Sequence, residues 1–383
     1  AAAEGAARPP ARDAALAAFR RHLAHIQTHV RDTFELGDLP GLAAARMLAG
    51  LTDGLITELF EHAVASVGGA GRWGAGRSGR MTIAATGGYG RGVLAPFSDI
   101  DLLFLTEGRP TAQVQRVVEF MLYFLWDLGL KVGHATRSKA DCLQSARGDH
   151  TVRTSLLDAR PIAGDAALFE DFATTFRAAC TEAGAALYIA AKQTERAARH
   201  RRYGDSAFVV EPNIKEGRGG LRDLQMLYWI ARYIFGSSTM GELAAPEGPA
   251  GGLLTAAEAR RALRSWNFLW ALRFHLHYVA GRAEERLTFD LQPVVGARMG
   301  YTRHSRQDGV ERFMRHYFLT AREVVRLTRV LEPALVRAAL GPPAAASGRA
   351  EAAVAAAGFM LADGQLLPAE GGDFDHERIQ VLR

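Results

Sequence analysis

Cysteine and long apolar segments are scarce in this sequence of 383 residues. Only two cysteines occur, Cys142 and Cys180, which excludes a disulfide framework and a cysteine-based zinc site. No apolar run approaches the roughly 20 residues that a membrane-spanning helix needs. Residues 1–12 also lack the apolar core of a secretory signal. We therefore expect a cytoplasmic protein that has no membrane among its partners.

Lysine is also rare, so arginine supplies most of the 46 basic residues. The net charge of +5 and the isoelectric point of about 9.4 suit anionic partners. The charges are spread along the chain and form no long basic block, so we do not expect nucleic acid as a partner. The four lysines are Lys131, Lys139, Lys192 and Lys215.

Hydrophobic periodicity separates one short strand-containing stretch from helical regions on both sides. Apolar, partly β-branched runs predict strands at residues 81–86, 100–105 and 130–136, with a helix at 114–128 between the last two. The rest of the chain is mainly helical in its spacing, with helices predicted at residues 14–30, 42–67, 151–157, 167–179, 221–234, 256–278 and 309–340. We therefore predict an α+β fold, in which a small mixed sheet is embedded in a mostly helical chain.

The same pattern predicts domain boundaries. A Pro/Ala/Ser-rich segment, residues 342–349, is a candidate linker, and residues 359–367 are a candidate hairpin. The predicted regions are an N-terminal helical region (1–75), a catalytic domain (76–165), a helical domain that binds substrate or nucleotide (166–340), and a linker with the start of a further region (341–383).

A glycine-rich segment follows the first predicted strand. Glycine permits positive φ and lets backbone N–H groups approach an anion closely, so this turn can hold a triphosphate. A glycine-rich turn on its own is more often only a turn. The candidate nucleotide-binding residues of the segment are Gly87, Gly88, Tyr89, Gly90 and Arg91.

Two aspartates stand at the start of the second predicted strand, directly after Ser98, which we add to the candidate nucleotide site. Side chains alternate across a strand, so Asp99 and Asp101 project from one face while Ile100 packs into the core. Two neighbouring carboxylates repel each other unless a cation lies between them, and Mg²⁺ favours carboxylate and phosphate oxygens. Such a pair alone is usually a solvated strand edge, but here it lies within fifteen residues of the glycine-rich turn. The combination predicts a metal-dependent nucleotidyltransferase.

A second glycine-rich cluster, residues 215–223, precedes a predicted helix. Paired glycines before a helix expose N–H groups, and flanking basic residues suit a phosphate or a base. The structural alternative is a tight interdomain turn in which Arg222 merely pairs with Asp223. The candidate nucleotide-binding residues here are Lys215, Gly219, Gly220 and Arg222.

The segment from Gly87 to Leu105 resembles the catalytic element of polymerase-β-like nucleotidyltransferases. More closely, the chain resembles the N-terminal part of the bacterial PII uridylyltransferase/uridylyl-removing family over about residues 40–340. One departure is Val93, where the family usually has Glu. The segments that carry the resemblance are WDLGLKVGHATRS (126–138), SLLDARPIAGD (155–165), EPNIKEGRGGLRDLQMLYWIAR (211–232) and VERFMRHYFLTAREVVRLTR (310–329).

The resemblance implies transfer of UMP from UTP to a tyrosine of the nitrogen-regulatory PII protein, with Mg²⁺ or Mn²⁺ bound by Asp99 and Asp101. It also implies a multifunctional enzyme whose uridylyl-removing and glutamine-sensing domains lie beyond Arg383, outside this chain. The alternatives are an adenylyltransferase of another protein such as glutamine synthetase, an RNA-directed nucleotidyltransferase, and a non-catalytic nucleotide-sensing module.

A third catalytic carboxylate is usual in the polymerase-β-like superfamily, and Asp127 is our candidate. The alternative role of Asp127 is to cap the turn that follows it. Some relatives carry Glu in place of Lys131, so that position cannot supply the acid here. His134 and Arg137, on or after the third predicted strand, are candidates for contacts with the triphosphate or the acceptor, although a structural role for His134 is equally compatible with the sequence.

Overall fold

The computed structural model describes residues 10–37, 39–67, 79–237, 239, 241–245, 247, 252–303, 308–341, 359–362 and 365–368. The candidate linker and the turn of the candidate hairpin lie outside these residues. The helices are α1 (Pro10–Glu35), α2 (Gly41–Val67), α3 (Gly87–Gly90), α4 (Ala112–Asp127), α5 (Lys139–Gly148), α6 (His150–Leu157), α7 (Ala166–Ala183), α8 (Ala185–Arg202), α9 (Leu221–Phe235), α10 (Ala256–Ala280), α11 (Leu291–Arg298) and α12 (Gly309–Leu340), with a 3-10 turn η2 (Glu242–Ala244). The strands are β1 (Met81–Ala85), β2 (Ile100–Thr106), β3 (Val132–Ser138), β4 (Arg160–Gly164), β5 (Phe359–Ala362) and β6 (Gln365–Pro368).

The larger sheet has four strands in the order β3-β2-β1-β4. Strand β1 pairs antiparallel with both β2 and β4, whereas β2 and β3 run parallel. The sheet is therefore mixed, and with the surrounding helices it confirms the predicted α+β fold. Strand β4 was not predicted, because its five residues include Pro161 and have little apolar character, as is common for an edge strand.

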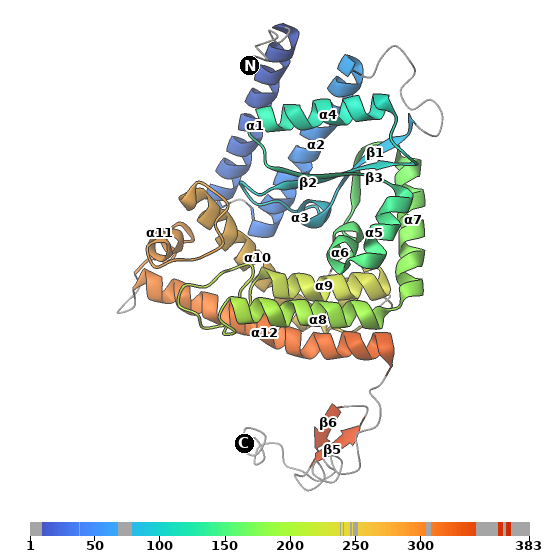
Figure 1. The fold of residues 1–383 in the computed structure, drawn as a ribbon. Helices are drawn as coiled ribbons and strands as arrows, with labels where there is room; N and C mark the ends of the chain where they lie inside the picture. Colours follow the sequence, from blue (N-terminus) through green and yellow to red (C-terminus); the bar gives the residue numbers. More distant parts are fainter. Residues whose placement is uncertain are drawn as a thin grey trace.

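Helices cover both faces of this sheet (Figure 1). On one face Ile100, Leu102 and Phe104 pack with α1, α2 and α4. On the other face Leu103 and Leu105 pack with α5, α6 and α7. The alternation of β2 thus divides its side chains between two cores, as the period of a strand requires.

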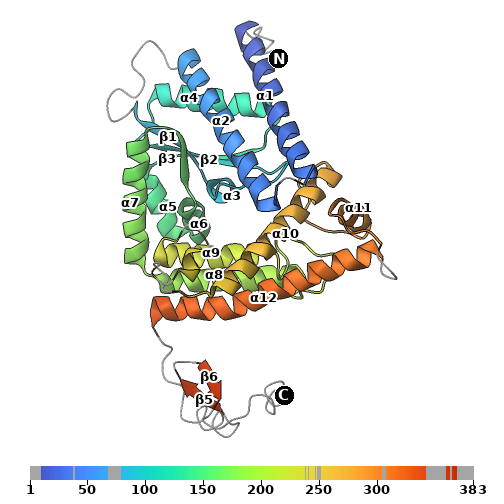
Figure 2. The ribbon, with the colours of Figure 1, turned by 180° about the vertical axis from the view of Figure 1, so that it is seen from behind.

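A second layer of helices lies beside the sheet module. Helix α12 runs along the outer side of α8 and α9, and α10 crosses toward α2 (Figures 1 and 2). Helices α2 and α10 approach closely at Gly41, where a Cβ atom would lie 2.1 Å from the backbone nitrogen of Ala271. This contact joins α2, which also packs on the sheet, to the helical layer.

Most predicted strands and helices match observed ones, and the sequence pattern missed α3, α5, α8 and α11. Helix α8 was missed because it is rich in charged residues and buries few apolar side chains. Strands β5 and β6 agree with the two arms of the candidate hairpin. Among the described helices, none combines the length and apolar character needed to cross a membrane.

Candidate active site

The two predicted metal-binding carboxylates lie at the first residues of β2. Ile100 is buried in the core between the sheet and α2 and α4, as predicted. Asp101 shares the opposite face with Leu103, while Asp99 is exposed just before the strand. The two aspartates are close enough for the charge of Asp99 to act on Asp101.

Glycines enclose the Asp101 side chain. A Cβ atom at Gly133, the residue paired with Asp101 on β3, would lie 2.3 Å from Asp101 Oδ1. At Gly87, which has φ +56°, a Cβ atom would lie 3.0 Å from Oδ2. The absence of these Cβ atoms gives the Asp101 carboxylate its place between α3 and β3.

The glycine-rich turn forms the single-turn helix α3 instead of an open loop. Thr86 precedes this helix, and its side chain makes no capping hydrogen bond. The first N–H groups of a helix have no acceptor within the helix, so those of Gly87 and Gly88 suit an external anion. The side chain of Tyr89, in contrast, is 1% exposed and packs in the core, so only its backbone could contact a nucleotide.

The charge around Asp101 favours a bound cation. Burial raises the pKa of Asp101, and Asp99 raises it further, whereas Lys215 and Arg91 act in the opposite direction. Within the described part of the chain, neither aspartate side chain forms a hydrogen bond or an ion pair. A divalent cation between the two carboxylates would relieve their repulsion.

These two carboxylates fit a metal whose other ligands come from a substrate. No group of three or more His, Cys, Asp or Glu residues that could hold a metal occurs among the described residues. Mg²⁺ characteristically binds through one or two carboxylates and completes its shell with phosphate oxygens and water. The site therefore suits a metal that arrives with a nucleoside triphosphate.

Arg91 and Ser98 lie near this pair in different settings. Arg91 forms an ion pair of 2.5 Å with the fully buried Asp158, and its guanidinium lies over the ring of Trp229. Its charge still reaches Asp101, and its buried Nε atom has no hydrogen-bond partner among the described residues. The Oγ atom of Ser98 is buried and has no hydrogen-bond partner among the described residues, so it is a polar group without a protein acceptor or donor.

Asp127 lies at the last residue of α4, outside the acid pair. Its carboxylate pairs with Arg12 at 2.7 Å, and its backbone oxygen accepts a hydrogen bond from Arg20. Both arginines come from α1. The role of Asp127 as a third catalytic acid stays a prediction.

The second glycine-rich cluster is built differently from the expectation. Gly219 N–H donates to Asp223 Oδ2 at 2.8 Å, and Gly220 N–H donates to the Gly217 oxygen at 2.9 Å. The prediction that these two glycines expose free N–H groups is therefore wrong. Gly219 also has φ +81° and lies against the backbone of Ala321, where a Cβ would come within 2.5 Å of its oxygen. Packing against α12 explains this glycine.

The basic residues of the cluster have different partners, and one of them, Lys215, lies within electrostatic reach of the acid pair. The predicted alternative pairing of Arg222 with Asp223 is also wrong, because Arg222 binds Glu216 at 2.9 Å and Gln225 at 2.8 Å. Burial lowers the pKa of Lys215, and the charge of Arg273 lowers it further. Lys215 is thus a partly desolvated cation within electrostatic reach of Asp101.

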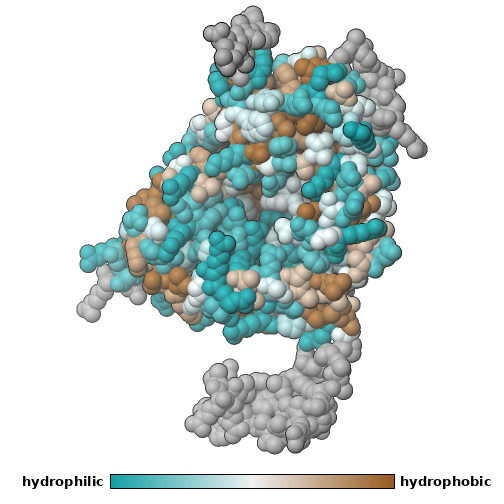
Figure 3. All heavy atoms as spheres, in the orientation of Figure 1, coloured by the Kyte–Doolittle hydropathy of each residue, from teal (hydrophilic) through white to brown (hydrophobic). Residues whose placement is uncertain are grey.

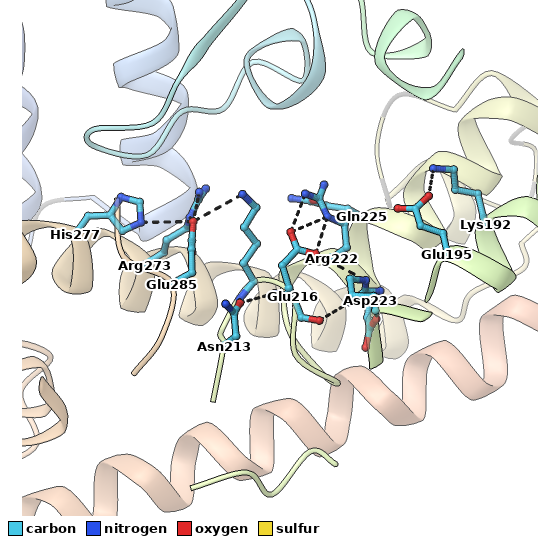
Figure 4. A network of polar contacts seen from close by, with 12 residues as sticks. Lys192, Glu195, Asn213, Glu216, Arg222, Asp223, Gln225, Arg273, His277 and Glu285 are labelled. Carbon is cyan, nitrogen blue, oxygen red and sulfur yellow. Dashed lines mark hydrogen bonds and ion pairs between the residues drawn. The ribbon is translucent and has the colours of Figure 1, made fainter. Parts of the chain in front are cut away.

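Three cations surround Trp229. The charged groups of Arg91, Arg222 and Lys192 lie 5.3, 5.3 and 4.9 Å from its rings. In Figure 4 the side chains of Lys192, Arg222 and Arg273 point toward the ribbon of the sheet module. Figure 3 shows the molecule hollowed between the sheet and the α8–α9 layer, with hydrophilic residues along the lower border of the hollow.

A cavity of about 260 Å³ touches Asp101 from the side of β3. His134 and Arg137, both candidates for substrate contacts, line it together with Gly133 and Ser155. The cavity gives a second molecule access to Asp101 beside the strands.

Two family models match this chain in the segments that form the site. Residues 76–162 match the nucleotidyltransferase domain, and residues 188–331 match the model described as GlnD PII-uridylyltransferase. The chain carries a nucleotidyltransferase domain and a GlnD PII-uridylyltransferase domain. We call the second of these, residues 188–331, the GlnD-type domain.

Curated relatives share the same region. The chain is 50% identical over 334 residues to the bifunctional uridylyltransferase/uridylyl-removing enzyme of Gluconobacter oxydans, which covers 85% of this chain and 34% of that protein. It is 53% identical over 251 residues to the protein of that name from Rhodospirillum rubrum (66% and 26%), and 44% identical over 332 residues to the one from Azospirillum brasilense (87% and 35%). The chain thus spans about a third of the length of these relatives.

The GlnD-type domain contributes residues that sequence reasoning missed. Lys192 is 3% exposed, and Trp229 donates a hydrogen bond from Nε1 to Asp158 of the nucleotidyltransferase domain at 2.8 Å. The scarcity of lysine was a usable signal, because Lys192 is one of only four lysines in the chain and one of the three cations around Trp229.

Proposed function

We propose that this chain transfers UMP from UTP to a tyrosine hydroxyl of the nitrogen-regulatory PII protein in the cytoplasm, with release of pyrophosphate. The observation that carries the proposal is the meeting of Asp101 and Lys215, one from each matched domain, within electrostatic reach of each other. A carboxylate pair for a metal and a cation for phosphates are what nucleotidyl transfer requires. The names of the relatives support uridylyl as the transferred group.

The reaction is a substitution at the α-phosphorus of UTP. A bond forms between the acceptor oxygen and the α-phosphorus, while the bond from that phosphorus to the bridging oxygen of the β-phosphate breaks. The bridging oxygen keeps the electron pair and leaves with pyrophosphate, and the hydroxyl proton passes to a base or to water. In the proposal, Asp99 and Asp101 hold Mg²⁺ or Mn²⁺, which when bound would stabilise the developing charge.

The other residues bind and orient the nucleotide. The N–H groups of Gly87 and Gly88 and the charges of Lys215, Arg222 and Lys192 favour a triphosphate. Anionic phosphates would also stabilise the charged form of Lys215, whose pKa burial lowers. The cavity beside Asp101 is the proposed route for the acceptor hydroxyl, since it reaches the acid pair from the β3 side.

Intact-mass spectrometry tests the proposal. Purified PII protein is incubated with this chain, Mg²⁺ and each nucleoside triphosphate in turn. A gain of one UMP mass with UTP alone is the expected result. A gain of AMP from ATP would instead indicate an adenylyltransferase. Tight binding of UTP with no mass gain on PII would indicate a nucleotide-sensing module.

A further inference from the structure

The loop that carries Asp99 into the site contains a strained residue. Phe97, two positions before Asp99, has φ +61° and is about half exposed. A bulky side chain rarely adopts this left-handed conformation, which persists only where the surrounding structure fixes it. The position of Asp99 therefore depends on the contacts that hold residues 94–98.

Two contacts from outside the loop anchor it. Leu94 N–H donates to the Ala45 oxygen of α2 at 3.0 Å. The Pro96 oxygen, three residues before Asp99, lies 2.5 Å from Nδ1 of His277 in α10. A carbonyl oxygen only accepts, so Nδ1 of His277 carries the proton. His277 is completely buried, and this contact joins the GlnD-type domain to the catalytic loop.

The other side of the His277 ring faces a carboxylate. Nε2 lies 3.6 Å from Glu285 Oε1, which Arg273 also binds at 2.5 Å. Burial alone would raise the pKa of Glu285, but the imidazole of His277 and the charge of Arg273 outweigh burial and hold it at about 2. Figure 4 shows His277 and Arg273 beside the Glu285 carboxylate, each joined to it by a dashed line.

The same carboxylate reaches the proposed triphosphate site. Lys215 Nζ lies 3.8 Å from Glu285 Oε1, and Ile214 N–H donates to the Glu285 backbone oxygen at 2.8 Å. Glu285 therefore contacts both the segment that carries Lys215 and the histidine that binds the Pro96 oxygen. A shift of His277 would change the distance between the metal-binding loop and the phosphate-binding lysine.

We infer that His277 is a positioning residue, which fixes the loop of Asp99 against Lys215 and so couples metal binding to triphosphate binding. The inference rests on the proposed nucleotidyl transfer and deepens it. His277 touches no reacting atom in this account. It acts through the Pro96 carbonyl on one side and Glu285 on the other.

Two variants of the full chain separate the parts of this role. His277→Ala removes the donor and leaves the Pro96 oxygen without a partner. His277→Gln keeps an N–H donor and is expected to restore part of the function. The matched control is His275→Gln, two residues earlier on α10, because His275 is also a buried imidazole but packs against Phe34.

Calorimetric titration of Mg²⁺ in the presence of a non-hydrolysable UTP analogue is the first readout, and transfer to PII is the second. A misplacement of about 1 Å can cost about a hundredfold in rate. We expect His277→Ala to weaken Mg²⁺ binding about tenfold and to lower kcat by about ten- to a hundredfold, with the metal-free affinity for the analogue unchanged. His277→Gln should lie between this variant and the unaltered chain, and His275→Gln should match the unaltered chain.

Several outcomes would overturn the inference. Lower thermal stability of His277→Ala with unchanged Mg²⁺ affinity and kcat below the melting temperature would reduce His277 to a packing role. Equal losses in His275→Gln would assign the effect to α10 as a whole. If the unaltered chain binds Mg²⁺ with the analogue but does not modify PII, the proposed acceptor is wrong while the Mg²⁺ titration still decides the role of His277. If His277→Ala does not fold, Mg²⁺ affinity in His277→Gln equal to that of the unaltered chain, at lower kcat, would contradict the coupling.

Discussion

The two carboxylates of the nucleotidyltransferase domain that form the acid pair differ sharply from two carboxylates of the GlnD-type domain, Asp223 and Glu285. Asp223 and Glu285 are each paired with an arginine, at 2.6 and 2.5 Å. Asp99 and Asp101 have no such partner among the described residues. Paired carboxylates compensate for their own desolvation, whereas the unpaired pair keeps a cost that only a bound cation relieves. Asp223 and Glu285 maintain the shape of the site, and Asp99 and Asp101 supply its chemistry.

The largest loss of transfer activity should follow from changing Asp99 or Asp101. Asp99→Asn or Asp101→Asn removes a charged ligand of the proposed metal, so we expect transfer to fall by about a thousandfold or more. Folding should be unaffected, since neither side chain forms an ion pair among the described residues. Steady-state kinetics and thermal unfolding measure the two properties. The control is Asp171→Asn, which changes an exposed aspartate that pairs with Lys139. Undiminished transfer in both active-site variants would remove the metal assignment.

A steric change can move one unpaired carboxylate while keeping its charge. In Gly133→Ala the added Cβ would lie 2.3 Å from Asp101 Oδ1, so the carboxylate must turn away. We expect kcat to fall about a hundredfold, because a 1 Å shift of a catalytic group costs about that much. Stability should change little, since the clash involves the end of a side chain. The control is Gly54→Ala on α2, where an added Cβ would meet no atom within 4 Å. Unchanged kcat in Gly133→Ala would mean that the position of Asp101 is not critical.

Changing a carboxylate that is paired with arginine should mainly lower the stability of the protein. Glu285→Gln leaves Arg273 and Lys215 without their shared counter-charge, and we expect a loss of about 3 kcal/mol in the free energy of unfolding near neutral pH. Urea unfolding monitored by Trp fluorescence measures it. Folding depresses the pKa of Glu285 from 4.5 to about 2, so the stabilisation is present above pH 4.5 and declines as pH falls toward 2. A difference between variant and unaltered chain that does not shrink over this range would contradict the ionised pair.

Sequence patterns located Asp99 and Asp101 at the start of β2, and they did not reveal the contacts of the GlnD-type domain. The acid pair lies within one short segment between two strands, so local alternation was enough to place Asp99, Ile100 and Asp101. The contact of His277 with Pro96 joins residues 181 positions apart, and nothing in the pattern of an aromatic-rich helix marks that histidine. The N–H group of Gly219 was predicted to be free, although the carboxylate that accepts its hydrogen bond, Asp223, lies only four residues further along the chain. This contact was missed because Asp223 was considered only as a possible partner of Arg222.

Arg222 tests whether a residue that is bound by other protein groups can also bind the nucleotide. Like the paired carboxylates it has partners within the protein, Glu216 and Gln225, but it also stacks on Trp229 beside Lys192. A triphosphate would compete for its guanidinium, and a charge-assisted hydrogen bond contributes about 1.5–3 kcal/mol. Part of that gain is offset by the lost contact with Glu216, so we expect Arg222→Ala to weaken UTP binding about tenfold in calorimetry.

The control for Arg222 lies on the same loop. Arg218 pairs with the exposed Asp205 at 3.1 Å and is expected to leave UTP affinity unchanged when replaced by Ala. Equal affinities for UTP in Arg222→Ala and Arg218→Ala would place Arg222 with the residues that only maintain the fold. A loss confined to Arg222→Ala would show that a paired residue also takes part in binding. The 215–223 cluster would then contain residues of both kinds. Gly219 and Asp223 would maintain the fold, and Lys215 and Arg222 would bind the nucleotide.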